Sequence, residues 1–185
     1  KNMDRLFIFD TTLRDGEQTA HVVFSYGEKI AIARMLDEIG VDQIEAGIPA
    51  MGGQEQRFIT ELASFDLRCS ILGWCRACEH DIKAAVSCGV DAVGISIATS
   101  DIHIKHKLRR DRKWILDAMR RSVAMAKEAN VYVSASAEDA SRSDLDFLIE
   151  LALAARAEGA DRFRYCDTLG VMDPFSIYKT IRALK

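Results

Sequence analysis

The sequence predicts a protein of the α/β class, in which strands and helices alternate, and three observations support this. A glycine with an aspartate two residues later ends three helical patterns, at residues 40–42, 89–91 and 159–161. Glycine commonly ends helices because it adopts the left-handed C-cap conformation without strain. An apolar run of strand length follows each of these sites, as expected for buried parallel strands. Several of these runs then end in charged or hydroxyl side chains.

The first three strand–helix units can be justified in order. Residues 6–9 are an apolar run that predicts the first strand. The helix over 25–39 begins with a capping box, Ser25 with Glu28 three residues later, and its apolar residues share one face. A strand over 41–46 and a helix over 54–64 follow it. A strand over 68–72 and a helix over 79–88 complete the third unit.

The second half of the chain repeats the pattern. An apolar run predicts a strand over 92–97, and Asp111 is expected to cap a helix that reaches about residue 129. A strand over 131–135 precedes a helix over 144–158, and a strand over 163–165 precedes a last helix that starts at Pro174. Six units fit part of a (β/α)₈ barrel or a six-stranded doubly wound sheet. The absence of Gly-x-Gly-x-x-Gly after the first strand disfavours the second arrangement.

Composition limits the possible functions. The 185 residues are 49% hydrophobic with a net charge of −3, which is typical of a globular domain with a sizeable core. No basic and aromatic stretch predicts a nucleic-acid partner, and no apolar run approaches the ~20 residues needed to cross a membrane. The five cysteines, an odd number, are expected to be reduced thiols in the cytoplasm. We expect one domain over residues 1–185 that acts on small molecules.

The most informative stretch follows the first strand. Residues 10–18 read Asp-Thr-Thr-Leu-Arg-Asp-Gly-Glu-Gln and place five charged or amide side chains together. Unpaired buried charge is costly, but active sites of barrels lie at the C-terminal ends of the strands. The stretch therefore indicates a functional site. The alternative is an ion pair that only stabilises the strand end, such as Arg14 with Asp15, Glu17 or Glu45.

This stretch resembles the signature of the DRE-TIM metallolyases, a family of metal-dependent Claisen-condensing enzymes and lyases. Residues 45–49, 99–103, 138–142 and 167–170 resemble further motifs of the family in the same order. The chain is most similar to its homocitrate synthases, especially those of nitrogen-fixing bacteria, and to its 2-isopropylmalate synthases. The resemblance implies a TIM barrel, of which residues 1–185 supply about six βα units and lack strands seven and eight.

The resemblance also implies an activity. A homocitrate synthase is an acyltransferase that condenses acetyl-CoA, its co-substrate, with 2-oxoglutarate, and thioester hydrolysis then gives homocitrate and CoA. The alternatives are a 2-isopropylmalate synthase, which uses 2-oxoisovalerate, and a catalytically inactive fragment. We expect the 185 residues alone to be inactive and the full-length enzyme to be a homodimer.

Three residues acquire reactive roles through the resemblance. Asp15 matches the carboxylate that binds a divalent metal, Mg, Mn or Zn. Arg14 matches the arginine that polarises the keto oxygen, and Glu138 matches the carboxylate that helps to remove a proton from the acetyl methyl group. The family's other metal ligands form a His-x-His motif, which none of the four histidines of this chain forms. We therefore expect these residues alone to bind metal weakly or not at all.

The resemblance and the strand ends also predict substrate-binding residues. These are Arg14, Gln18, Glu45, His103, Ser136, Arg164 and Thr168. Thr168 matches the hydroxyl that binds the carboxylate of the oxo acid, and His103 is expected in a loop after the fourth strand. Strand alternation predicts that Arg164 shares the interior face with Thr168 and reaches toward Ser134. Arg164 is our first candidate for binding the second carboxylate of 2-oxoglutarate, and Arg76 is the second.

Overall fold

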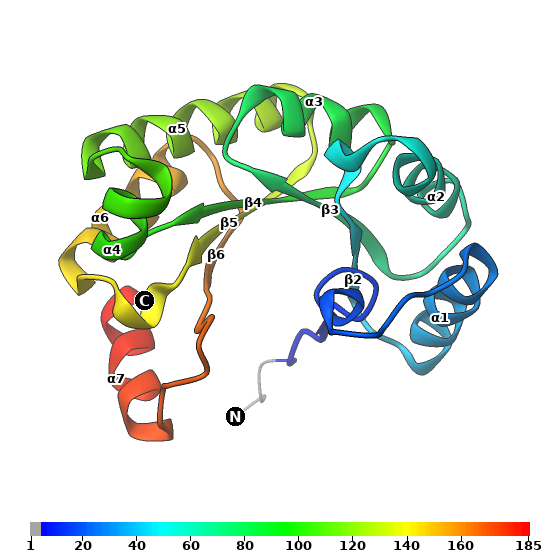
Figure 1. Ribbon diagram of the computed structural model, residues 1–185, viewed down its shortest axis with the longest axis horizontal. Helices are drawn as coiled ribbons and strands as arrows, with labels where there is room; N and C mark the ends of the chain where they lie inside the picture. Colours follow the sequence, from blue (N-terminus) through cyan, green and yellow to red (C-terminus); the bar gives the residue numbers. More distant parts are fainter. Residues whose placement is uncertain (1–4) are drawn as a thin grey trace.

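The computed structural model describes residues 5–185, which form one parallel sheet with the strand order β1-β2-β3-β4-β5-β6. The strands are β1 Phe9–Asp10, β2 Gln43–Gly47, β3 Ser70–Arg76, β4 Ala92–Ala98, β5 Tyr132–Glu138 and β6 Arg162–Tyr165. Figure 1 shows the sheet curled into an open arc with helices around its outer side. The chain therefore forms part of a (β/α) barrel, as predicted, and β1 and β6 are the edges of the sheet.

Helices connect consecutive strands. The long helices are α1 Tyr26–Ile39, α2 Gly53–Ala63, α3 Glu79–Ser87, α5 Arg112–Glu128, α6 Leu145–Ala157 and α7 Pro174–Leu184. The predicted capping box of Ser25 and Glu28 is present at α1, and Gly40 ends that helix at φ 87°. Asp111 caps α5 by accepting a hydrogen bond from the amide of Trp114. In residues 5–185 no helix is both long and apolar enough to cross a bilayer.

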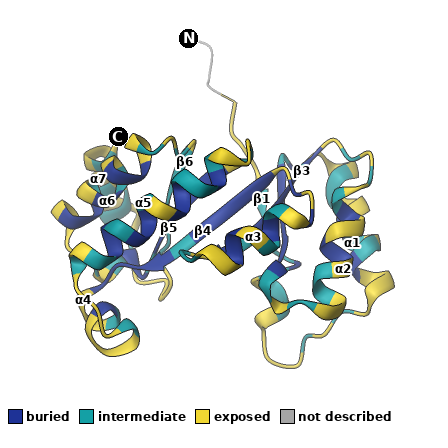
Figure 2. Ribbon diagram, turned by 90° about the horizontal axis from the view of Figure 1, so that it is seen from above, coloured by how far each residue is buried: buried dark blue, intermediate teal, exposed yellow. Residues whose placement is uncertain are grey.

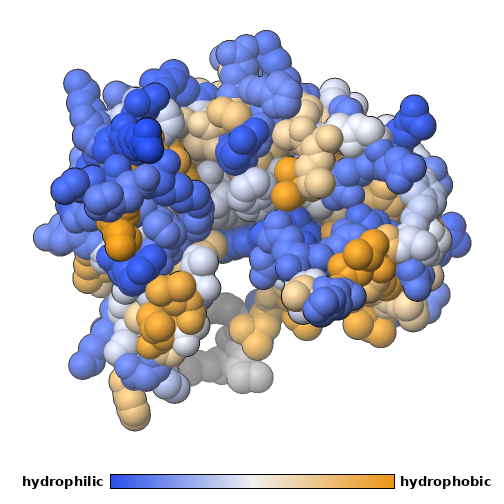
Figure 3. All heavy atoms as spheres, viewed as in Figure 1, coloured by the Kyte–Doolittle hydropathy of each residue, from blue (hydrophilic) through white to orange (hydrophobic). Residues whose placement is uncertain are grey.

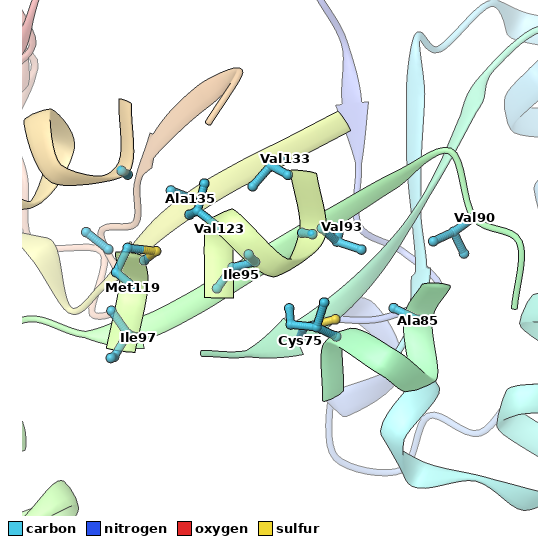
Figure 4. Close-up of a cluster of buried hydrophobic side chains, with 14 of the residues drawn as sticks. Cys75, Ala85, Val90, Val93, Ile95, Ile97, Met119, Val123, Val133 and Ala135 are labelled. Carbon is cyan, nitrogen blue, oxygen red and sulfur yellow. The ribbon is translucent and has the colours of Figure 1, made fainter. Parts of the chain in front are cut away.

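The hydrophobic core lies between the sheet and the helices. Alternate residues of β4 and β5, such as Val93, Ile95 and Val133, point outward and pack on Met119 and Val123 of α5 (Figure 4). Figure 2 shows that β4 is buried along most of its length. The apolar contacts between the outer face of the sheet and the helices stabilise the arc. The inner face of the sheet is therefore free to carry polar side chains.

The inner face of the sheet is polar, which is unusual for a small barrel. It carries Gln43, Glu45, Trp74, Ser96, Ser134, Ser136, Arg162 and Arg164. The register pairs Ser134 with Arg162 and Ser136 with Arg164, so these side chains form two successive layers. Hydrogen bonds from Arg162 to Gln43 and from Arg164 to Glu45 cross the arc from β6 to β2.

Several predicted boundaries were wrong for physical reasons. The first strand is Phe9–Asp10 rather than 6–9, because only these residues pair with β2, and Leu6 to Ile8 are exposed at the sheet edge. The strands predicted over 68–72 and 131–135 extend to Arg76 and Glu138. The end of β5 alternates polar and apolar residues, and the end of β3 contains Gly73 and Arg76, so a search for apolar runs ends too early in both. His103 ends a short helix, α4 Asp101–His103, rather than lying in a loop.

Candidate active site

A polar cleft of about 480 Å³ lies at the C-terminal ends of the strands. Six of its lining residues were predicted from the sequence: Arg14, Asp15, Gln18, Glu138, Arg164 and Thr168. They come from segments after β1, from the end of β5, and from β6 and the loop that follows it. The fold therefore brings together side chains separated by up to 154 residues of sequence, from Arg14 to Thr168.

Glu45 of β2 is the anion beneath this cleft and is 0% exposed. Its Oε2 accepts hydrogen bonds from Arg14 Nε at 2.7 Å and is 2.6 Å from Arg14 Nη2. Its Oε1 accepts from Arg164 Nη1 at 3.2 Å. Burial lowers the pKa of Arg164, but the Glu45 carboxylate opposes this and the net pKa is raised. Glu45 thus holds two charged guanidinium groups at the cleft wall.

Aromatic rings fix the same two arginines from the side. The Arg14 guanidinium lies 5.6 Å from the centroid of the Trp74 ring, and that of Arg164 lies 4.8 Å from the Phe9 ring. Arg14 Nη1 also donates to Asp15 Oδ1 at 3.0 Å. The Asp15 side chain is 65% exposed, so its carboxylate faces the open side of the cleft.

Arg162 lies one layer below Arg164 and has neutral hydrogen-bond acceptors. It donates to Ser134 Oγ at 3.1 Å and to Gln43 Oε1 at 2.6 Å. Burial lowers the pKa of Arg162, and the charge of the neighbouring Arg164 acts in the same direction. The prediction that Arg164 reaches Ser134 was therefore wrong by one register step, because Arg162 occupies that position.

Glu138 closes the other side of the cleft. Its Oε1 is 2.6 Å from Nζ of Lys107, which lies in a π-helical turn, Ile104–Leu108. His103 Nδ1 lies 3.8 Å from the same oxygen. Such turns are rare and occur often at functional sites. Lys107 was not among the predicted site residues, yet the structure places it in direct contact with Glu138.

Asp139 organises the segment behind Glu138. It is buried with a left-handed backbone, φ 59°, which is a strained conformation for a residue other than glycine. Its carboxylate accepts hydrogen bonds from Ser100 and Arg142, and its amide donates to Thr168 Oγ1 at 2.9 Å. These bonds hold the pKa of Asp139 below its ordinary value against the effect of burial.

Three predicted substrate-binding residues lie outside the lining of the cleft. Glu45 and Ser136 are buried under it, and His103 lies behind Glu138. His103 Nδ1 is 3.4 Å from Asp139 Oδ2, although the orientation does not form a hydrogen bond. Arg76 is bound to Asp81 through Nε at 2.8 Å and is not part of the cleft lining.

The cleft also contains residues that were not predicted. These are Ile48, Trp74, Ser96, Lys107, Cys166 and Asp167. Strand alternation would have identified Trp74 and Ser96, because both follow inward-facing positions by two residues. Asp167 begins the 167–170 motif, which indicated its neighbourhood although not its role, and it accepts a hydrogen bond from the Met172 amide at 2.8 Å.

The side chains around Asp15 do not provide a full set of metal ligands. Within residues 5–185, no three histidine, cysteine, aspartate or glutamate side chains gather as metal ligands. Asp15 offers one carboxylate, which already accepts a hydrogen bond from Arg14. A divalent cation prefers several oxygen ligands, so these residues do not form a metal site by themselves.

A second, more apolar pocket of about 350 Å³ adjoins the cleft. Its walls include both tryptophans of the chain, Trp74 and Trp114, together with Ile97 and Leu108. It shares Trp74, Ser96, Lys107 and Glu138 with the cleft. Glu138 therefore lies at the boundary between the polar cleft and the apolar pocket.

The chain matches the HMGL-like family over residues 5–185. It is 57% identical over 180 residues to 2-isopropylmalate synthase 2 of Caldanaerobacter subterraneus subsp. tengcongensis, covering 97% of the chain and 47% of that protein. It is 45% identical to homocitrate synthase 1 of Nostoc sp., covering 98% of the chain and 48% of that protein. The chain thus spans about half the length of these two relatives.

Another curated relative and two solved structures are also similar to the chain. Homocitrate synthase subunit alpha of Clostridium pasteurianum is 46% identical, over 96% of the chain and 66% of that protein. HMG-CoA lyase of Bacillus subtilis superposes with a TM-score of 0.82 at 17% identity, over 97% of the chain and 64% of that structure. The Pseudomonas aeruginosa hydroxymethylglutaryl-CoA lyase gives 0.81 at 18% identity, over 97% and 63%. At such identities the two structures show the fold alone.

Proposed function

Because the chain belongs to the HMGL-like family, we propose that it is the first part of the catalytic barrel of an acyltransferase that condenses acetyl-CoA with a 2-oxo acid. The observation that carries this proposal is the position of Glu138 between a polar cleft and an apolar pocket. A condensation needs a base that contacts the acetyl methyl group, and the keto carbon of the acceptor must lie close to that methyl carbon. The curated relatives named as synthases support the same reaction class.

The roles of the residues follow from their contacts. Glu138 removes a proton from the acetyl methyl group, and the resulting enolate carbon forms a bond to the keto carbon of the acceptor. Arg14, fixed by Glu45 and Trp74, donates to the keto oxygen as negative charge develops there. Thr168 binds the carboxylate next to the ketone. Water then hydrolyses the thioester and CoA leaves.

A divalent metal is a proposed cofactor of the full-length enzyme, with Asp15 as one ligand. The other ligands must come from outside residues 5–185, since those residues hold no group of three such side chains. None of the steps above depends on the metal.

We propose 2-oxoglutarate as the acceptor. Three arginines, Arg14, Arg162 and Arg164, face the interior of the arc, and Glu45 is the buried acid among them. Among these side chains, three guanidinium groups face one carboxylate, so a ligand carboxylate that reached them would be paired with a cation. The second candidate is 2-oxoisovalerate, which the 57% identity to a 2-isopropylmalate synthase favours. Ile48 and Trp74 in the cleft wall would suit its apolar side chain.

CoA thiol release by the full-length enzyme tests both proposals. With acetyl-CoA and saturating metal, we expect thiol release only when a 2-oxo acid is present, and a higher kcat/KM with 2-oxoglutarate than with 2-oxoisovalerate. The reverse preference would make the protein a 2-isopropylmalate synthase. No release with any 2-oxo acid would contradict the proposed reaction class.

A further inference from the structure

Lys29 of α1 is a buried cation that the proposed reaction does not use. It is 8% exposed, and its Nζ lies 2.6 Å from Glu17 Oε2 and 2.8 Å from Glu55 Oε2. The same nitrogen is 5.2 Å from the centroid of the Phe58 ring. Glu17 belongs to the signature stretch after β1, and Glu55 belongs to α2. Lys29 therefore joins two segments that are distant in sequence.

The other carboxylate oxygen of each glutamate accepts a hydrogen bond from a backbone amide in or next to a segment that lines the cleft. Glu17 Oε1 accepts a hydrogen bond from the amide of Phe24 at 3.3 Å. Glu55 Oε1 accepts one from the amide of Ile48, also at 3.3 Å. A Cβ added to Gly47, which has φ 150°, would lie 2.0 Å from Glu55 Oε1, so the close approach of Glu55 requires glycine there.

Both joined segments line the cleft. Asp15 and Gln18 flank Glu17 on one wall, and Ile48 forms another part of the lining. Burial lowers the pKa of Lys29, but the two carboxylates outweigh this and the net pKa is raised. Loss of the cation would leave two partly buried carboxylates close together without a counter-ion, a strongly unfavourable arrangement.

We propose that Lys29 is a positioning residue that sets the spacing between the Asp15–Gln18 wall and the Ile48 wall of the cleft. That the ligand is a 2-oxo acid rests on the proposed function, whereas the coupling of the two walls through Lys29 does not. A change on one wall is transmitted through Lys29 to the other wall and alters affinity for the 2-oxo acid.

Hydrogen–deuterium exchange of the full-length enzyme tests the coupling. In Glu17→Gln, exchange is expected to rise both in residues 16–24 and in residues 47–51, although the substitution touches only the first segment. Lys29→Met should have the same effect on both, and Lys29→Arg should restore wild-type exchange. The matched control is Lys83→Met, which removes an exposed lysine that pairs with Glu79 on α3 and should change neither segment.

Steady-state kinetics below the unfolding temperature separates positioning from simple stabilisation. Lys29→Met should raise KM for the 2-oxo acid by about 10-fold or more and change kcat less, because binding geometry is lost and the reactive groups remain. If exchange in Glu17→Gln rises only in residues 16–24 and KM is unchanged, the proposal is wrong. If Lys29→Met does not fold, Glu17→Gln alone tests the proposed coupling. A wild type without thiol release would refute the reaction class but leave the exchange result valid.

Discussion

Glu45 shows how a carboxylate can be fully buried at the base of a polar cleft. Removing a charge from water costs several kcal/mol, and Glu45 recovers this through Arg14 and Arg164, which bind its two oxygens separately. The two guanidinium groups in turn lose conformational freedom before any ligand arrives. Such preorganisation lowers the cost of binding an anion or stabilising a developing alkoxide.

Replacement of Arg164 tests the proposed acceptor. Arg164→Met in the full-length enzyme should reduce kcat/KM for 2-oxoglutarate by at least ~10²-fold, about 2.7 kcal/mol of charge-assisted binding. The loss for 2-oxoisovalerate should be far smaller, because that acceptor has no second carboxylate. Arg164→Lys, which keeps the charge, is the control for the loss of the ion pair with Glu45. Equal losses for both acceptors would exclude Arg164 as the specificity cation.

For single residues, the sequence predicted which face of a strand a side chain occupies, but not which residue lies beside it on the next strand. Alternation along β6 correctly placed Arg164 on the inner face. The pairing of Ser134 with Arg162 depends on how β5 and β6 align, and the sequence of neither strand specifies that alignment. The contact between Lys107 and Glu138 was also beyond sequence reasoning, because it depends on a π-helical turn.

Among the secondary-structure elements, the junction between β3 and α3 depends on one carboxylate. Asp81 is fully buried in the first turn of α3 and accepts hydrogen bonds from Arg76 N at 3.0 Å and Nε at 2.8 Å. Burial alone would raise the pKa of Asp81, but the bonds from Arg76 outweigh it and hold the pKa well below its usual range. The arginine is thereby held out of the cleft.

This depressed pKa predicts a pH-dependent contribution to stability. The stabilisation is present above the unfolded-state pKa of about 3.9 and is lost as the pH falls toward the lower folded-state pKa. Asp81→Asn should lower the free energy of unfolding by about 1–3 kcal/mol at pH 7. The difference from wild type should shrink below about pH 4.

Urea unfolding at pH 7 and at lower pH measures this effect. Asp66→Asn, which alters an exposed carboxylate, is the control and should stay within about 0.5 kcal/mol of wild type. If the Asp81→Asn difference were independent of pH, Asp81 would not be the titrating group.

The strands illustrate what the sequence could predict about elements. The six units, their order and the caps of α1 and α5 were predicted correctly, because helix caps and apolar runs are local signals. The ends of β3 and β5 were not. Ser134 and Ser136 interrupt the apolar pattern of β5, since they face a polar interior instead of the helices. Interior polarity is a property of the whole barrel and cannot be detected in a short window.

The whole molecule presents two open sheet edges, β1 and β6. Exposed apolar side chains are found on residues 6–8 before β1 and on α7 after β6, where Phe175, Tyr178 and Ile181 are exposed. Figure 3 shows hydrophobic surface in the region that α7 occupies in Figure 1. Open edges and exposed apolar surface both favour association with another chain. The 185 residues alone are therefore predicted to self-associate at micromolar concentration, as measured by light scattering. A monodisperse monomer would contradict this prediction.

Glu138, between the polar cleft and the apolar pocket, is the residue proposed to remove the proton from the acetyl group. The most direct test is Glu138→Gln in the full-length enzyme, with kcat measured by thiol release and 2-oxo acid affinity by calorimetry. Glutamine keeps the shape and removes the basic oxygen, so kcat should fall by roughly 10²–10⁴-fold while affinity for the 2-oxo acid stays within about 3-fold of wild type. A variant that loses affinity and retains kcat would make Glu138 a binding residue and contradict the account.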